Sequence, residues 1–308
     1  MNLLNSSYTI EDQKEFDLRG IKKFIEKCAR VCYKSESKIT EDSYEKFVGN
    51  LIKKGHMRPL EFGTVYLFIP ISDAETYKDV VDFYKNDKWS KCSCYMDSNY
   101  MDSNEKGKIT QGYYITTNYR VIIENNVEHH LKFLCEPKKY HSIRHTVHFI
   151  LSRGCMDDFR THITLSHLGE STRYCNYTNE KFGGITYIIP QWCNNIMPIE
   201  NIESTSDFKK YIQEHKCSPE EIILLKAFSI ASLSYKTLVA LGKIPQESRE
   251  VLPMGIKSEL ISCGFEDAWD NFFSRRNAPD AQKEAQHLAK YLSMDFNDRG
   301  WYNPTQCA

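Results

Sequence analysis

The chain alternates between segments whose apolar residues recur at helical spacing and short segments rich in β-branched and aromatic residues, and this alternation constrains its fold most strongly. Helices are predicted over residues 18–32, 40–55, 126–134, 156–165, 218–242, 245–253, 266–276 and 280–292. Strands are predicted over residues 64–70, 112–123, 142–151 and 256–263. Because short connections favour antiparallel neighbours, we expect an α+β fold in which helices pack on an antiparallel or mixed sheet.

The segment Ser218-Pro219-Glu220-Glu221 is a strong helix start. Serine suits the N-cap, proline the first helical position, and Glu221 the capping-box position three residues after the serine. The helix over 218–242 is the longest predicted, and a helix of this length is typical of the centre of a core.

Composition limits the classes of function. The 308 residues can bury one large core or two ordinary ones, and the 41% hydrophobic and 26% charged fractions are those of a folded soluble protein. Lys plus Arg number 40 and Asp plus Glu number 41, so no overall positive field favours nucleic acid. An anion-binding site must therefore be local.

Cysteine usage points to a reducing compartment. The eleven cysteines are an odd number, and the N-terminus lacks the charged and apolar regions of a signal peptide. We therefore expect free thiols and a cytoplasmic protein. No apolar run approaches the roughly 18 residues that span a membrane. Cys92 and Cys94 lack a second ligand pair at matching spacing, so no metal site is predicted.

Residues 85–112 are polar and contain a direct duplication, in which Tyr95 to Asn99 are repeated as Tyr100 to Asn104. Two copies are too few for a repeat fold. We predict a loop insertion at about 85–112.

A polar cluster over residues 170–177 stands where a core segment would be expected. Within it, Ser171, Thr172 and Arg173 supply the hydroxyl and guanidinium donors that hold a phosphate. From these residues alone, a phosphate site and a surface ion pair both remain open.

Three further arginines need weighing. Arg249 lies in a predicted short helix. Arg276 ends an aromatic-faced helix, where its positive charge interacts favourably with the helix C-terminus. Arg144 precedes His145 in a predicted strand, where the two side chains face opposite ways. We assign the Arg144-His145 pair to structure.

The region around the polar cluster closely resembles the signature region of flavin-dependent thymidylate synthases. Its matching residues are Arg153-Gly154, Ser166, Glu170-Ser171-Thr172-Arg173-Tyr174-Cys175-Asn176-Tyr177 and Lys181-Phe182-Gly183. The resemblance continues, in the family's order, in Cys32-Tyr33-Lys34-Ser35, Gly55-His56, Leu60-Glu61 with Thr64, Pro245 to Pro253, Lys257-Ser258-Glu259-Leu260, Trp269, Phe272-Phe273 and Arg276. The resemblance spans most of the chain and implies one thymidylate synthase-like domain over residues 1–308.

The resemblance implies an enzyme that makes dTMP from dUMP. Members take a carbon from methylenetetrahydrofolate and a hydride from FAD that NADPH has reduced. They form homotetramers whose active sites combine several subunits.

The resemblance also implies roles by position. Ser171, Thr172 and Arg173 would hold the nucleotide phosphate and sugar, and Arg249 would be a second nucleotide contact. Arg276 would face the uracil ring, where a guanidinium stabilises the negative charge that develops as C5 becomes nucleophilic. Arg249 and Arg276 are therefore the expected catalytic residues.

The family's Arg-His-Arg motif, implied to contact the flavin on a helix, falls on Thr161-His162-Ile163, where only the histidine remains. Arg160 is displaced by one position, about 100° around a helix, and cannot simply substitute. The implied cofactor contacts are His162, Thr64 and Arg160, although a half-buried structural role for His162 also remains open. The absence of two charge-assisted bonds of about 1.5–3 kcal/mol each predicts weaker FAD binding. Other departures from the family pattern lie at Phe62, Asp157, Asp158, Phe265 and Asn271.

Two hypotheses follow. The first is a divergent enzyme of this family, or a relative acting at C5 of another pyrimidine nucleotide. The second is a catalytically silent nucleotide-binding homologue that senses a dUMP-like ligand or pairs with an active subunit. A cysteine-nucleophile thymidylate synthase is rejected, because the surroundings of Cys175 do not resemble that family's nucleophile motif.

Overall fold

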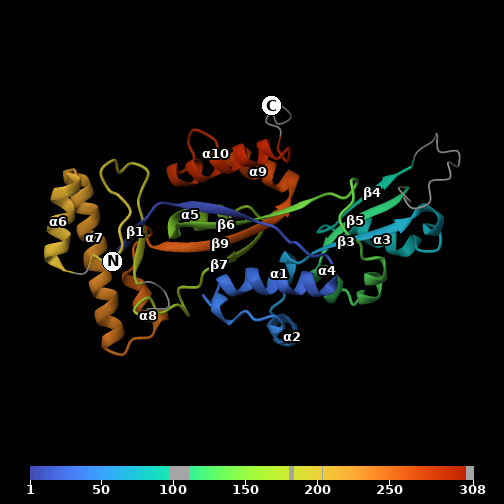
Figure 1. Ribbon diagram of the computed structural model, residues 1–308, viewed down its shortest axis with the longest axis horizontal. Helices are drawn as coiled ribbons and strands as arrows, with labels where there is room; N and C mark the ends of the chain where they lie inside the picture. The colour runs from blue at the N-terminus through green and yellow to red at the C-terminus, as the bar shows by residue number, and fades with distance from the viewer. Residues whose placement is uncertain (97–110, 180–183, 203, 303–308) are drawn as a thin grey trace.

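The computed structural model describes residues 1–96, 111–179, 184–202 and 204–302. It contains a four-stranded and a three-stranded antiparallel sheet and a two-stranded parallel pair, all with helices packed against them (Figure 1). The predicted α+β class is confirmed.

The four-stranded sheet lies at the centre of the molecule, with strand order β2-β6-β9-β7. Its strands are β2 (Ser7–Glu11), β6 (Arg144–Ser152), β7 (Ser166–Gly169) and β9 (Lys257–Phe265). The two nine-residue strands β6 and β9 pair along their whole length, from Arg144 opposite Phe265 to Ser152 opposite Lys257. This long central pair carries the rest of the sheet.

Helices cover both faces of this sheet (Figure 1). On one face lie α5 (Arg153–Phe159), α9 (Glu266–Arg276) and α10 (Lys283–Asp298), which share an aromatic-rich core with β6 and β9. The largest buried rings of that core belong to Phe149, Phe159, Trp269, Phe272, Phe273 and Phe296. On the other face, α1 (Leu18–Val31) packs against Leu168, Ile261 and Cys263 through its own buried stripe.

The three-stranded sheet has the order β3-β5-β4 and extends from one end of the central sheet (Figure 1). Its strands are β3 (Thr64–Pro70), β4 (Lys91–Tyr95) and β5 (Gly112–Asn118). Three helices pack around it: α2 (Ser43–Lys53), α3 (Lys78–Asn86) and α4 (Tyr119–Glu124).

At the opposite end, the parallel strands β1 (Asn2–Leu4) and β8 (Thr186–Ile188) pack with three helices (Figure 1). These helices are α6 (Thr205–His215), α7 (Pro219–Ala240) and α8 (Pro245–Ser248). A single turn of 3₁₀ helix, Arg249–Val251, follows α8. The β6–β9 pair therefore bridges two peripheral units.

Several predicted elements are confirmed, notably the strand at 64–70 and the helices at 18–32, 40–55, 266–276 and 280–292. Other boundaries were wrong. The strand predicted over 112–123 ends at Asn118, whose side chain accepts from the backbone N–H of Val121 and starts α4. The helix predicted over 126–134 is a 3₁₀ helix, Glu128–Phe133.

The helix predicted over 156–165 is displaced. It begins at Arg153, because the Ser152 hydroxyl caps it by accepting from the backbone N–H of Cys155, and it ends at Phe159. Thr161, His162 and Ile163 therefore lie in the turn between α5 and β7 and not on a helix.

The loop insertion predicted at about 85–112 was wrong in part. Lys91–Tyr95 form strand β4, which pairs with β5 from Lys91 opposite Thr116 to Tyr95 opposite Gly112. Residues 97–110, which hold most of the duplication, lie outside the described residues.

Helix α7 is not the central core helix that its length suggested. Only one side is buried, at Leu225, Phe228 and Tyr235, while apolar side chains are exposed on the other. The exposed residues of α7 and its continuation are Ile223, Ile230, Leu233, Leu241 and Ile244, at 56–76% exposure. By length and composition alone this helix could span a membrane, a test that core helices of soluble proteins also pass.

The capping box of α7 gives a test of stability. Glu221 is buried, and its carboxylate accepts from the backbone N–H groups of Asn194, Asn195 and Ser218, each at 2.8 Å. Glu221→Ala leaves these three backbone N–H groups without an acceptor. It should lower the free energy of unfolding by about 2–3 kcal/mol in urea denaturation. Glu220→Ala, at the exposed neighbour, should cost much less, because this substitution leaves no buried donor without an acceptor. Equal losses in the two variants would contradict this role.

Candidate nucleotide site

The polar cluster forms a turn at the end of β7. The backbone N–H of Glu170 donates to the carbonyl of Glu259 on β9 at 2.7 Å, and that of Ser171 donates to the carbonyl of Cys32 at 3.1 Å. The Ser171 carbonyl then accepts from Tyr174 and Cys175, each at 3.1 Å. The turn is thus fastened to β9 and to the end of α1.

Two side-chain hydrogen bonds join the turn to the segment that follows α7. Arg249 donates from Nη1 to the hydroxyl of Thr172 at 3.2 Å, and Arg173 donates from Nε to Oε1 of Gln246 at 3.1 Å. We call these residues, with Ser171, the Thr172–Arg249 site. Two guanidinium groups and the Thr172 hydroxyl, from segments more than 70 positions apart, therefore lie together. This donor set suits a phosphate.

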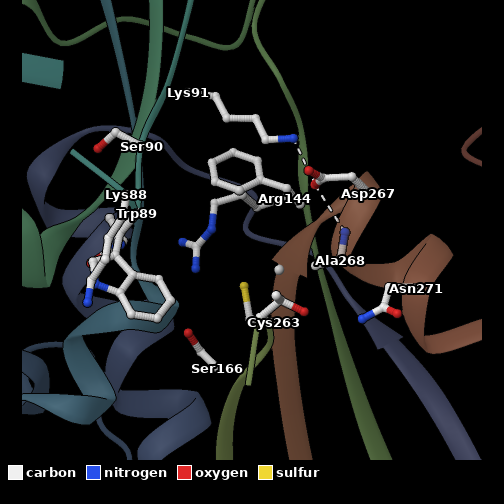
Figure 2. Close-up of a pocket in the computed structure, with 14 residues that line it drawn as sticks. Lys88, Trp89, Ser90, Lys91, Arg144, Ser166, Cys263, Asp267, Ala268 and Asn271 are labelled. Atoms are coloured by element: carbon white, nitrogen blue, oxygen red, sulfur yellow. Dashed lines mark hydrogen bonds and ion pairs between the residues drawn. The ribbon is translucent and has the colours of Figure 1, made fainter. Parts of the chain in front are cut away.

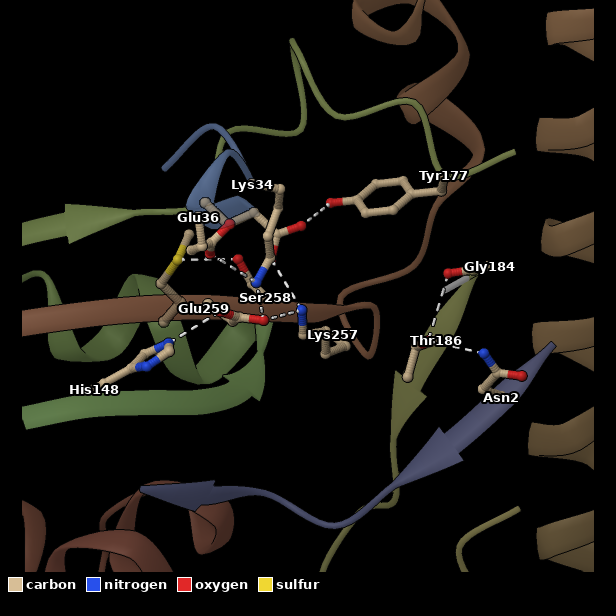
Figure 3. Close-up of polar contacts among 12 residues, drawn as sticks. Asn2, Lys34, Glu36, His148, Tyr177, Gly184, Thr186, Lys257, Ser258 and Glu259 are labelled. Atoms are coloured by element: carbon tan, nitrogen blue, oxygen red, sulfur yellow. Dashed lines mark hydrogen bonds and ion pairs between the residues drawn. The ribbon is translucent and has the colours of Figure 1, made fainter. Parts of the chain in front are cut away.

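A buried ion network lies behind the turn (Figure 3). Lys257 donates to Glu170 at 3.2 Å and also pairs with Glu259, which in turn pairs with Lys34. Nε2 of His148 lies 3.0 Å from the second oxygen of the Glu259 carboxylate, as Figure 3 shows. Two lysines thus face two buried carboxylates.

The contacts within the network keep Glu259 and Lys257 in their charged forms. Burial opposes ionisation of Glu259, but the His148 contact and the two lysines hold the pKa of its carboxyl well below the usual range. Burial also disfavours charge on Lys257, but Glu170 and Glu259 raise the pKa of its ammonium. The Tyr177 hydroxyl donates to the remaining oxygen of Glu170 at 2.9 Å. The base of the turn at Glu170 is therefore held by paired, opposite charges.

Arg276 lies elsewhere, at the other end of β7. It donates from Nε to Nε2 of His162 at 2.8 Å, and from Nη2 to the Asp158 carbonyl at 2.5 Å and the Thr161 hydroxyl at 2.8 Å. Since β7 rises about 3.3 Å per residue, its two ends are about 10 Å apart. Within one chain, the structure does not bring Arg276 to the Thr172–Arg249 site.

His162 is buried beside that arginine. Burial, together with the positive charge of Arg276, lowers the pKa of His162 to about 4. At neutral pH the ring is therefore uncharged, and its Nε2 accepts from Arg276.

The other two implied cofactor contacts do not join His162. Arg160 is exposed at the end of α5, 3.9 Å from the Asp157 carboxylate. Thr64 is buried at the start of β3, and its hydroxyl accepts from Nη1 of Arg144 at 3.3 Å. Within this chain, His162, Arg160 and Thr64 therefore do not lie together as the contacts of one flavin would.

A pocket lined by Arg144 was not anticipated (Figure 2). It has a volume of about 200 Å³ and lies between the α3–β4 connection and the junction of β9 with α9. Its lining includes Lys88, Trp89, Lys91, Arg144, Phe265 and Asn271. Sequence reasoning assigned Arg144 to structure, yet Figure 2 shows its guanidinium projecting into this pocket.

The cysteines show no sign of chemistry. The ten that the structure describes are free, and Cys175 is fully buried. Burial raises the pKa of the Cys32 thiol to about 12. Among the residues that the structure describes, no group of three or more His, Cys, Asp or Glu side chains could hold a metal ion.

Lys257, Glu259 and Gln246 also belong to the site, and no role was predicted for them. One signal was available for two of them: the charged residues Lys257 and Glu259 stand in a strand that is otherwise buried, where charges occur when paired. Gln246 offered no such signal.

The chain was compared with known proteins. Residues 96–298 match the family model Thy1, described as thymidylate synthase complementing protein. No curated protein matches the chain. The UMP/dUMP methylase PolB from Streptomyces cacaoi, bound with 5-Br UMP, has a TM-score of 0.41 and 14% identity, covering 97% of this chain and 92% of its own. ThyX from Helicobacter pylori, with FAD and dUMP, has a TM-score of 0.38 and 16% identity, covering 53% and 72% respectively.

The His162–Arg276 contact predicts a pH dependence. Burial lowers the pKa of both His162 and His167 to about 4, below the value of about 6.5 in unfolded chains. Between these values the unfolded state binds more protons, so stability should be fully present above about pH 6.5 and fall as the pH drops towards 4. Urea denaturation across this range measures the effect.

Substitution of the arginine tests the cause. Arg276→Gln removes a positive charge that lowers the pKa of His162, so the His162 ring should titrate at higher pH in NMR. Arg275→Gln, at the exposed neighbour, should have a smaller effect. An unchanged His162 titration in Arg276→Gln would refute the contact.

Proposed function

This chain belongs to the family of flavin-dependent thymidylate synthases, and we propose that it converts dUMP to dTMP, using methylenetetrahydrofolate, FAD and NADPH. The family match covers about two thirds of the chain, residues 96–298. The observation that carries the proposal is the hydrogen bond between Arg249 and Thr172, which joins two separated motifs of the family resemblance at one anion-binding site.

In this proposal, Arg173 and Arg249 bind the nucleotide phosphate. Each guanidinium can offer paired N–H donors to phosphate oxygens, and the hydroxyls of Ser171 and Thr172 add further donors. The buried Glu170 holds the turn in place, because Lys257 and Tyr177 both bind its carboxylate. The phosphate site is thus preorganised before the nucleotide arrives.

The catalytic role proposed for Arg276 requires more than one subunit. In the chain itself this side chain is bound to Asp158, Thr161 and His162. We therefore propose a homotetramer in which residues of different subunits complete each active site. The exposed apolar residues along α7 support an interface, because monomers rarely expose large apolar patches.

FAD, once reduced by NADPH, would supply the hydride. Thr64, His162 and Arg160 do not form one flavin site in the chain, but the pocket lined by Arg144 offers aromatic and cationic side chains. The proposed protein is a single cytoplasmic domain over residues 1–308, with no nucleic-acid or membrane partner.

A second function has specific support. Thr161 and Ile163 replace the arginines implied to contact the flavin, and Arg276 is held by the turn that contains them. A catalytically silent homologue that binds a pyrimidine nucleotide would keep the Thr172–Arg249 site without the chemistry. A relative that acts on another pyrimidine nucleotide would keep both.

Titration of dUMP and FAD into the purified protein, followed by a dTMP assay with all cosubstrates, separates these functions. The proposed enzyme binds both ligands and forms dTMP. Nucleotide binding without FAD binding or turnover would identify the silent homologue. Failure to bind any pyrimidine nucleotide would refute both.

Single substitutions test the residues. Arg173→Ala and Arg249→Ala should each weaken dUMP binding by about 1.5–3 kcal/mol, roughly tenfold to a hundredfold, because each removes charge-assisted bonds to the phosphate. Cys175→Ala should leave dUMP affinity nearly unchanged in isothermal titration calorimetry. The reverse pattern would overturn the assignment.

A further inference from the structure

We infer that the pocket lined by Arg144 and Trp89 holds one aromatic ring system of FAD with an adjoining phosphate, and that Arg144 supplies the positive charge that Thr161 and Ile163 cannot offer. This inference rests on the proposed function for the identity of the ligand. Its physical basis is the charge, shape and aromatic lining of the pocket.

The lining of the pocket is positive. It contains three cations, Lys88, Lys91 and Arg144, and one carboxylate, Asp267. Asp267 is paired with Lys91 at 2.7 Å, so it compensates that lysine. Arg144 has no carboxylate partner among the residues that the structure describes, and its contacts are with the neutral hydroxyl of Thr64 and the ring of Phe265. An uncompensated guanidinium in a pocket suits an anion.

The pocket also offers aromatic surfaces. The Trp89 ring is 41% exposed and lines the pocket from the α3–β4 connection, and Phe265 lines it from the end of β9. The Arg144 guanidinium lies 5.7 Å from the centre of the Phe265 ring. Lys88 lies 5.1 Å from the centre of the Trp89 ring, and rings beside cations are surfaces on which planar heteroaromatic groups stack.

The size of the pocket restricts what it can hold. Its volume of about 200 Å³ is below the roughly 300–1,000 Å³ of sites that enclose a whole ligand. It therefore accommodates one part of a larger molecule, whose remainder lies outside this chain's pocket. A dinucleotide such as FAD, with two ring systems joined by phosphates, has suitable parts.

The position of Arg144 explains how it can replace the missing cations. It is the first residue of β6, and it faces Phe265 across the β6–β9 pairing. Thr164 and Ser166, which closely follow the altered Thr161-His162-Ile163 turn, line the same pocket. The pocket therefore borders the segment where the family's arginines are absent, and Arg144 supplies a positive charge there from a different strand.

Equilibrium dialysis with FAD tests the inference, with dUMP affinity measured in parallel. Arg144→Gln should weaken FAD binding about tenfold to a hundredfold, since it removes one charge-assisted hydrogen bond, and leave dUMP affinity within roughly twofold. Trp89→Ala should weaken FAD binding about tenfold by removing the stacking surface, and Trp89→Phe should retain most of it. Arg144→Lys should bind more tightly than Arg144→Gln.

Arg19→Gln is the matched control, because Arg19 is an exposed arginine on α1 that pairs with Glu41 and does not line the pocket. It should leave FAD affinity unchanged. Equal FAD affinities in Arg144→Gln and Arg19→Gln would overturn the inference. Wild-type protein that binds dUMP but not FAD would also overturn the inference, and the proposed nucleotide site would be unaffected by that result.

Arg173→Ala distinguishes the two sites. It should reduce dUMP affinity and keep FAD affinity, the opposite of Arg144→Gln. If Arg144→Gln failed to bind either ligand through misfolding, Trp89→Ala would decide, because it keeps every cation of the pocket. Unchanged FAD affinity in Trp89→Ala would then overturn the inference.

Discussion

The full-length pairing of β6 with β9 is the interaction on which the rest of the structure depends. Helix α5 continues directly from β6, and α9 continues directly from β9, so the aromatic core under both helices is positioned by one ladder of backbone hydrogen bonds. β7 adds to the free side of β9. Each candidate site lies at an end of this pair, so the register of the pairing positions the side chains of both sites.

The two ends of the pair differ in chemistry. At the Lys257 end, a charge-balanced network supports the turn that carries Arg173 and contacts Arg249, a donor set that suits a phosphate. At the Phe265 end, Arg144 and Trp89 border a small pocket. The strand pair therefore separates two groups of cationic side chains, one around Arg249 and one around Arg144.

The sequence predicted the elements whose signals are local. The β-branched run that begins at Thr64 and the aromatic stripe of α9 determine their own structure, and both were located correctly. The start of α5 was missed because Ser152 follows a β-rich run, although its hydroxyl caps the helix. The contact of Arg276 with His162 could not be predicted, because it joins residues 114 positions apart through tertiary packing. The grouping of Thr172 with Arg249 came from family resemblance and not from spacing.

The buried network of Lys34, Glu170, Lys257 and Glu259 has a consequence for how such a protein can diverge. Removal of one member leaves an uncompensated charge in the interior, which costs more than removal of a complete pair. A lysine and its carboxylate must therefore be replaced together for the chain to remain folded. Arg173 and Arg249, which lie outside the buried network, carry no such restriction, so the residues at the surface of the turn can change while the interior stays as it is.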